Sequence, residues 1–181
     1  LVRALMTSAR AERMMREACV RASLTLIERT AQDEHAALVE HLRMRGELTT
    51  AFLVRVVAYG RIDFFGAALV SLAGQQQGRV RALLSTGRDV ALSSLFRAAR
   101  LPPVSHGVIL RALKVWREVA NGKRIAGPQE VSFLMLRRLE EVVSSGAVAD
   151  EKGSLAGLLK SIHLEALREN ARGHALAIAA A

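Results

Sequence analysis

The sequence has little of what fixes a chain through crosslinks, rigid turns or aromatic clusters. Its 181 residues include one cysteine, three prolines and only 4% aromatic residues. A lone cysteine excludes an internal disulfide framework, and so few prolines leave long stretches free to form helices. Because 51% of the residues are still hydrophobic, the core must consist of Leu, Val, Ala and Met, which is typical of packed helices.

Long hydrophobic runs are also missing. The apolar tail over 175–181 is far shorter than the about 20 residues that span a bilayer, so we expect no membrane segment and interpret the tail as a fraying helix end or a dimer contact. Cys19 shares a helical stripe with Met15, Ala22 and Leu26, which predicts a buried structural thiol. A single cysteine suits a reducing compartment, so we expect a cytoplasmic protein.

Glycines divide the centre of the chain into short helical units. Gly60, Gly74 and Gly87 are 14 and 13 residues apart, about the length of one helix and one tight turn. Each unit has one apolar stripe, and helices of roughly 9 to 12 residues are marginal alone because nucleation is costly. The units must therefore pack together. The sequence predicts an all-α fold, an array of about eight to nine short antiparallel helices that is either a HEAT-like helical repeat or an irregular bundle.

Local signals mark several helix ends and solvent faces. Thr49 or Thr50 supplies an N-cap hydroxyl, Asp63 is predicted to cap the next helix, and Arg55 is predicted to face water. Trp116 is predicted to anchor the helix that follows the proline pair. The remaining local predictions are one long helix or two in line over 1–30, a helix capped by Asp33 that runs to about Arg45, a helix that begins at Pro103 or Val104, and a helix that begins at Pro128. Further predictions are an outward Arg137–Glu141 pair, a mobile loop over 144–153, and a last helix capped by Ser154 and broken at Gly173.

Three regions follow one another in what we expect to be one continuous domain. They are N-terminal helices over 1–46, a central helical array over 47–125 and a C-terminal helical pair over 126–181. Because the sequence begins with Leu1 and not with methionine, we expect a fragment of a longer protein. Residues 1–10 faintly echo residues 79–88, and a true repeat would make the two segments equivalent helices of a solenoid.

A family resemblance rests on the central residues. In order they are Leu48-Thr49, Phe52-Leu53, Arg55, Gly60, Phe64-Phe65, Ala68-Leu69, Leu72-Ala73-Gly74, Arg79-Val80-Arg81, Leu83-Leu84 and Ala99-Arg100-Leu101-Pro102. Over roughly residues 45–120 this order resembles the C-terminal half of a bacterial family, common in alphaproteobacteria, known as domain of unknown function 2336. The sequence departs from the family at Gly60-Arg61-Ile62-Asp63, where the family usually has Gly-Asp-Leu. The resemblance implies a helical, repeat-like, soluble bacterial protein and supplies no catalytic residues.

Positive charge is concentrated in one quarter of the chain. The formal net charge is +9, and residues 79–124 contain ten basic and two acidic side chains. A GC-rich genome would explain the excess of arginine over lysine but not this clustering. If the ten side chains converge on one surface, they could bind phosphate or an acidic protein partner. These candidate contacts are Arg79, Arg81, Arg88, Arg97, Arg100, Arg111, Lys114, Arg117, Lys123 and Arg124.

No pattern in the sequence indicates catalysis or a bound cofactor. His35 and His41 are six residues apart, about 240° around a helix, so they cannot share a metal ion as an i, i+4 pair can. Adjacent acids such as Glu140 and Glu141 point to different sides, and no glycine-rich phosphate loop follows a predicted strand. We therefore expect no enzyme activity, no cofactor and no metal site.

Two functions are compatible with these features. The preferred interpretation is a non-enzymatic helical scaffold for protein–protein interaction, with an unknown protein or a second copy of the chain as partner. The alternative is a nucleic-acid-binding regulator that uses residues 79–124. Against the alternative, the sequence shows no clear helix-turn-helix pattern and few aromatic residues on which bases could stack.

Overall fold

Residues 2–143 and 149–179 are described by the structure, a computed structural model. They form nine α-helices and one 3₁₀ turn, and no strand occurs in these ranges. The all-α prediction and the predicted number of helices are therefore confirmed. Residues 144–148 of the predicted mobile loop lie outside the described residues, whereas its second half, from Ala149, is already helical.

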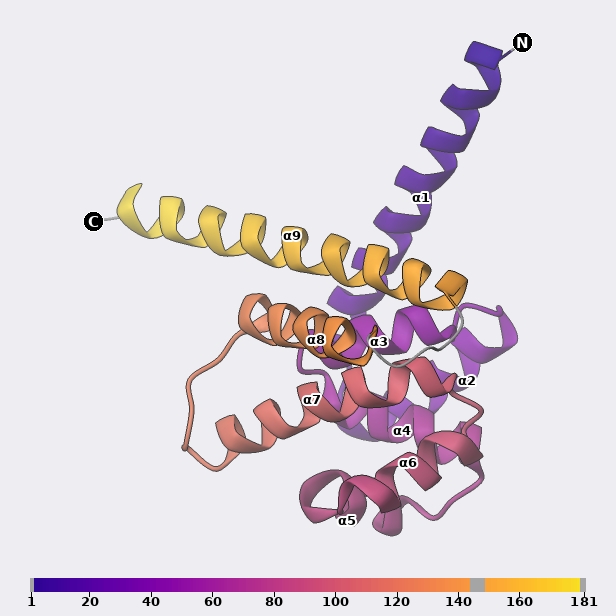
Figure 1. The fold of residues 1–181 in the computed structure, drawn as a ribbon, viewed down its shortest axis with the longest axis vertical. Helices are drawn as coiled ribbons and strands as arrows, with labels where there is room; N and C mark the ends of the chain where they lie inside the picture. Colours follow the sequence, from indigo (N-terminus) through magenta and orange to yellow (C-terminus); the bar gives the residue numbers. More distant parts are fainter. Residues whose placement is uncertain (1, 144–148, 180–181) are drawn as a thin grey trace.

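The helices form one body with two projecting arms. In chain order they are α1 (Val2–Arg29), the 3₁₀ turn η1 (Gln32–Glu34), α2 (His35–Met44), α3 (Thr50–Ala58), α4 (Ile62–Ala73), α5 (Gln77–Thr86), α6 (Asp89–Ala98), α7 (Pro103–Ala120), α8 (Pro128–Val143) and α9 (Ala149–Ala179). Figure 1 shows α2 to α8 gathered together, while α1 and the far end of α9 extend away in different directions. Helix α4 contacts α2, α3, α5 and α6, and α8 contacts both α7 and α9.

Helix α4 is the centre of the core because its paired phenylalanines are fully buried. Phe64 makes edge-on ring contacts with Phe52 of α3, at 6.2 Å between ring centroids, and with His35 of α2, at 5.6 Å. Phe65 makes a similar contact with Phe96 of α6 at 6.1 Å. Truncating one such side chain to alanine typically costs about 3–5 kcal/mol, so these rings hold four helices in place.

Trp116 anchors α7 to the end of α3, as predicted. Gly60 ends α3 in the left-handed conformation, with a φ of +74°. A Cβ atom at Gly60 would lie 3.0 Å from Cζ2 of Trp116, so only glycine lets the indole lie so close. The indole Nε1 donates a hydrogen bond of 2.7 Å to the carbonyl oxygen of Val57. Gly87 differs from Gly60 because it is extended, with a φ of −62°, and α5 ends without a left-handed glycine.

The prediction that Arg55 faces water is wrong. Arg55 is only 6% exposed, and its guanidinium forms an ion pair with Glu165 of α9. Every residue of α3 from Phe52 to Ala58 is buried, so this helix has no polar side. The charge is tolerated inside the protein because α9 brings an opposite charge to it.

Among the predicted side-chain caps, that of α3 is correct, and those of α2, α4 and α9 are wrong. Thr49 caps α3, and its hydroxyl accepts a hydrogen bond from a backbone amide of the first turn. Asp63 does not cap α4, because Arg61 occupies the N-cap position. Asp63 lies in the first turn, where its negative charge interacts favourably with the helix dipole. Asp33 lies in η1, and Glu34 is the residue that precedes α2.

The prediction of a buried Cys19 is also wrong. Cys19, Met15 and Leu26 are exposed, whereas Leu24 and Ile27 on the neighbouring side of α1 are buried. Figure 1 shows the reason, since α1 meets the body only near its end and the rest of the helix projects from it. The apolar stripe of the sequence therefore lies on a side of α1 that the body leaves uncovered.

Three predictions for the last two helices are wrong as well. Ser154 lies inside α9 and does not begin it, and the helix continues unbroken through Gly173. On α8, Glu141 pairs with Arg138 at 3.1 Å and not with Arg137. Arg138 and Glu141 are three residues apart, so their side chains lie on the same side of α8.

Candidate functional site

The ten basic candidates do not converge on one surface. Arg79 and Arg81 are two residues apart on α5 and therefore point about 200° apart. Arg88 precedes α6, Arg97 lies within it, and Arg100 follows it. The other five, on α7 or in the loop after it, are Arg111, Lys114, Arg117, Lys123 and Arg124. Clustering in the sequence therefore does not bring all ten side chains to one surface, since Arg79 and Arg81 already point to different sides of α5.

Arg117 is engaged within the molecule and joins α7 to α5. Its guanidinium donates hydrogen bonds to the carbonyl oxygens of Leu84, Leu83 and Gly87, at 2.6, 2.7 and 3.0 Å. These carbonyls belong to the end of α5, where a helix leaves acceptors unsatisfied and its dipole favours a positive charge. Burial lowers the pKa of Arg117 from its ordinary value, an effect that the nearby charge of Asp89 opposes. Arg117 therefore has a structural role.

Two further candidates are also occupied by intramolecular contacts. Arg124 pairs with Glu118 of α7 at 3.2 Å and with Glu130 of α8, and these hydrogen bonds raise the pKa of Arg124. The arginine thus ties the α7–α8 loop to both helices. Arg97 donates weakly within its own helix, to the carbonyl oxygen of Ser93 at 3.4 Å.

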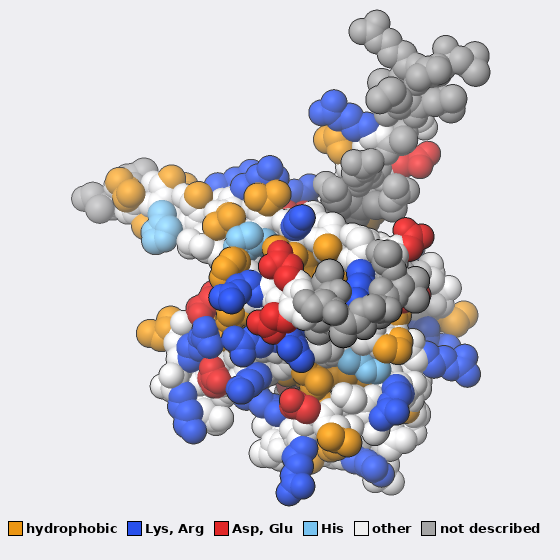
Figure 2. Space-filling view, in the orientation of Figure 1, with side chains coloured by type: hydrophobic (Ala, Val, Ile, Leu, Met, Phe, Trp, Pro, Cys, Tyr) orange, Lys and Arg blue, Asp and Glu red, His pale blue; other side chains and the backbone are white. Residues whose placement is uncertain are grey.

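A basic strip follows the seam between α7 and α8 and consists of Arg111, Lys114 and Arg138. Arg111 and Lys114 share one side of α7 with Gly107, from which they are four and seven residues away. A Cβ atom at Gly107 would lie 3.7 Å from Nε of Arg138, so Arg138 reaches from α8 to this side of α7. Figure 2 shows basic side chains gathered over α7 and α8, with acidic ones among them. Sequence reasoning missed Arg138 because it lies outside residues 79–124.

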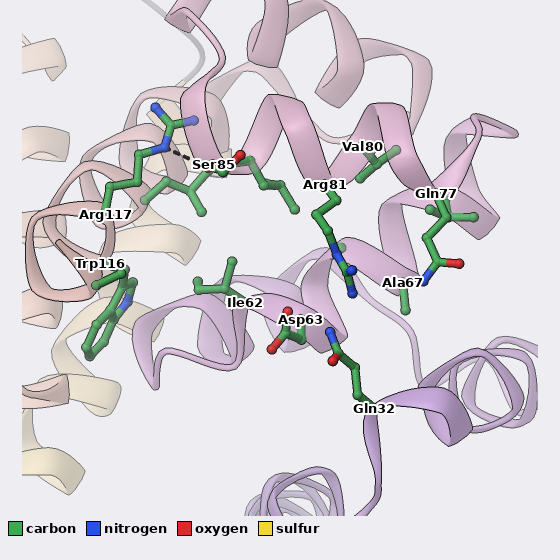
Figure 3. A pocket seen from close by; sticks show the side chains of 15 residues that line it. Gln32, Ile62, Asp63, Ala67, Gln77, Val80, Arg81, Ser85, Trp116 and Arg117 are labelled. Atoms are coloured by element: carbon green, nitrogen blue, oxygen red, sulfur yellow. Dashed lines mark hydrogen bonds between the residues drawn. The ribbon is translucent and has the colours of Figure 1, made fainter.

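An apolar pocket of about 250 Å³ opens between α4, α5 and α7. Figure 3 shows it from close by. Gly66 allows α5 to approach α4, since a Cβ there would lie 3.1 Å from Cδ1 of Leu84. The hydrogen bonds of Arg117 hold the end of α5 above the pocket. Its apolar walls are Ile62, Ala67, Val70, Val80, Leu84, Leu113 and Trp116.

One end of this pocket holds Arg81, Asp63 and Gln32, whereas Arg117 and Ser85 lie toward the end of Trp116. In Figure 3, Arg81 reaches from α5 toward Asp63 of α4 and Gln32 of η1, while Trp116 and Ile62 lie at the other end. Arg81 and Asp63 are both exposed, and neither has an ion pair or hydrogen bond with another described residue. The pocket therefore has mostly apolar walls and, at one end, one charge of each sign without a partner among the described residues, while the charge of Arg117 is held by carbonyl oxygens.

A second hollow of about 480 Å³ lies where α1 meets α3 and α9. Its lining includes Met15 and Cys19 of α1, Phe52 of α3 and Leu158 of α9. The uncovered stripe of α1 thus borders a groove on the body. Sequence periodicity predicted the stripe but could not indicate that none of the described helices covers it.

Three of the histidines lie in different parts of the fold and differ in their hydrogen-bond partners. His35 is buried, and neither ring nitrogen has a hydrogen-bond partner among the described residues. Nε2 of His106 lies 2.9 Å from the carbonyl oxygen of Leu101, and Nδ1 of His163 lies 3.2 Å from Oγ of Ser132. Within residues 2–143 and 149–179, no group of three or more His, Cys, Asp or Glu side chains is placed to hold a metal ion.

An all-helical protein with an apolar pocket is the class that these features define, and none of its described helices is both long and apolar enough to cross a membrane. The chain belongs to DUF2336, a family described as an uncharacterised protein conserved in bacteria, which matches residues 1–149. The match is therefore wider than the central segment on which the resemblance rests, since it includes α1 and α2 and ends where α9 begins. No curated protein and no solved structure matches the chain.

Proposed function

We propose that the protein is a non-enzymatic helical scaffold that binds an acidic protein partner through its two projecting helices. The observation that carries this proposal is the exposure of large apolar side chains on these helices. Met15 of α1 is 68% exposed, and Leu164, Leu167 and Ile178, which share one side of α9, are 51%, 36% and 77% exposed. Apolar side chains that gather uncovered on a soluble surface commonly mark a contact site.

Charge favours a different protein over a second copy of this chain as the partner. The formal net charge of +9 makes two copies repel each other. The exposed far part of α9 carries Arg168 and Arg172 beside a single acid, Glu169. A partner with an apolar stripe bordered by acidic residues would complement both the uncovered side chains and this charge.

Co-purification from a bacterial host, together with light scattering, tests this proposal. The double variant Leu164→Glu/Ile178→Glu, on one side of α9, should lose a protein that the unaltered chain retains. Val90→Glu is the matched control, because Val90 is 76% exposed on α6 and lies on neither projecting helix. Equal retention by both variants would contradict the proposal. If light scattering shows that the unaltered chain and Val90→Glu are dimers and that the double variant is a monomer, the partner is a second copy of the chain.

The alternative, a nucleic-acid-binding regulator, is supported by the basic strip along α7 and α8. Arg111, Lys114 and Arg138, the last in exchange for its exposed pair with Glu141, could contact about three phosphates, so log K should fall with log salt with a slope of about −2.7. Ten converging basic residues would instead give a slope near −9. A mobility-shift titration of the Arg111→Ala/Lys114→Ala variant beside the unaltered chain measures this slope. No binding in about 50 mM salt would exclude the alternative.

A further inference from the structure

We propose that the pocket between α4, α5 and α7 binds a small zwitterion with an apolar side chain, such as an apolar α-amino acid. This ligand site goes beyond the scaffold function and does not depend on it. The site uses the mouth residues Arg81 and Asp63 and the inner walls around Trp116.

The size of the pocket limits the ligand. Its volume of about 250 Å³ is below the roughly 300–1,000 Å³ typical of pockets for larger ligands. A branched or aromatic side chain of amino-acid size fits this space. Ile62 and Trp116 line the end opposite Arg81, and the buried Leu113 also lines the pocket, so an apolar group placed against them is removed from water.

The two free charges at the mouth select the kind of head group. In Figure 3 the exposed side chains of Arg81 and Asp63 lie at the same end of the pocket, and they form no ion pair with each other. A fatty acid would bring its carboxylate close to Asp63, and an amine would bring its positive charge close to Arg81. A zwitterion places its carboxylate at Arg81 and its ammonium at Asp63, so it alone is matched at both positions. The amide of Gln32 can hydrogen-bond either group.

The pocket is preformed, which reduces the entropy lost on binding. Arg117 fixes the end of α5 through three carbonyl oxygens, and Trp116 is fixed by its hydrogen bond to Val57. Gly66 supports the close contact between α4 and α5. The walls therefore need no large movement to accept the ligand.

The fluorescence of Trp116 offers a direct readout, because it is the only tryptophan and it lines the pocket. We expect L-leucine to shift its emission with a dissociation constant of about 1 mM or below. The probes 4-methylpentanoate, which lacks the ammonium, and isoamylamine, which lacks the carboxylate, should each bind at least about fivefold more weakly. Equal binding of L-leucine and either probe would overturn the proposal, as would no signal change and no heat of binding with L-leucine at about tenfold this concentration.

Two variants with matched controls locate the site. Arg81→Glu should weaken L-leucine binding at least about tenfold, whereas Arg79→Glu, on the opposite side of α5, should change it less than about twofold. Ala67→Leu should fill the pocket and abolish binding, whereas Ala82→Leu, exposed on α5 and outside the pocket, should not. Circular dichroism verifies that each variant keeps its helices. If Arg79→Glu weakens binding as much as Arg81→Glu, or if Ala67→Leu binds normally, the site is not this pocket.

Discussion

Removing either member of the buried Arg55–Glu165 pair should destabilise the protein far more than breaking a surface pair. The two side chains are 7% and 12% exposed, so a single replacement leaves the other charge inside the contact between α3 and α9. Such a loss costs about 3–5 kcal/mol, whereas an exposed pair contributes about 0.2–1 kcal/mol. Domains have about 5–15 kcal/mol of stability, and at this chain length the loss lowers Tm by roughly 6–20 °C.

A double-mutant cycle in urea, followed by circular dichroism, measures this effect. We expect Arg55→Met and Glu165→Met each to lose about 3–5 kcal/mol, and the double variant to lose less than either, because no unpaired charge remains. Arg43→Met is the control, since Arg43 pairs with Glu40 at 2.7 Å and both side chains are 51% exposed. Single losses under about 1 kcal/mol that simply add in the double variant would refute the reasoning and the docking of α9 on α3.

Three further predictions concern single positions. Gly60→Ala should cost about 2 kcal/mol or more in urea unfolding, because a clash with the adjacent indole adds to the cost of a left-handed φ. Gly74→Ala should cost only about 1 kcal/mol, because Gly74 has a φ of +61° but no atom lies within 4 Å of its Cβ position. Equal losses would show that the clash is relieved. His35→Phe keeps the ring contact and removes two unpartnered nitrogens, so it should stabilise by about 1 kcal/mol and raise Tm by about 2–4 °C; a fall in Tm would mean that these nitrogens are satisfied in solution. Burial, and then the charges of two glutamates, raise the pKa of Tyr59 above its ordinary value of 10.0. The folded state therefore keeps a proton that the unfolded chain releases, so stability should fall as pH rises above about 10, by at most about 1.4 kcal/mol per pH unit and less because the ring is partly exposed. Tyr59→Phe should flatten this fall, and phenolate absorbance of the sole tyrosine near pH 10 in the folded protein would contradict the shift.

The parts of the fold that the sequence predicted are those that depend on neighbouring residues. Thr49, Gly60, Pro103 and Pro128 act within a turn of the helix ends they define, and the structure confirms these ends. Arg55 could not be predicted in this way, because its partner lies 110 residues further along the chain. Periodicity describes a side of a helix, but not whether another helix covers it.

The candidate site depends even more on contacts between distant segments. The basic residues are close in the sequence, yet Arg79 and Arg81 diverge on one short helix, and Arg117 and Arg124 are used to hold helices and a loop. The pocket needs side chains from three helices and η1, so no single stretch of sequence contains its pattern. Arg81 was among the candidates for its charge alone, and its position opposite Asp63 is visible only in three dimensions.

Helix α9 lies beyond the segment that matches the family, yet it closes the core. Leu155, Leu159 and Ile162 are buried in it, and its Glu165 neutralises a charge that belongs to the matched segment. The end of the family match is therefore not the end of the cooperatively folded unit. A piece trimmed at residue 149 would lose the cover over α3 and α8 and keep a stranded cation. In this chain, the segment after the family match therefore supplies both the cover over α3 and the counter-charge of Arg55.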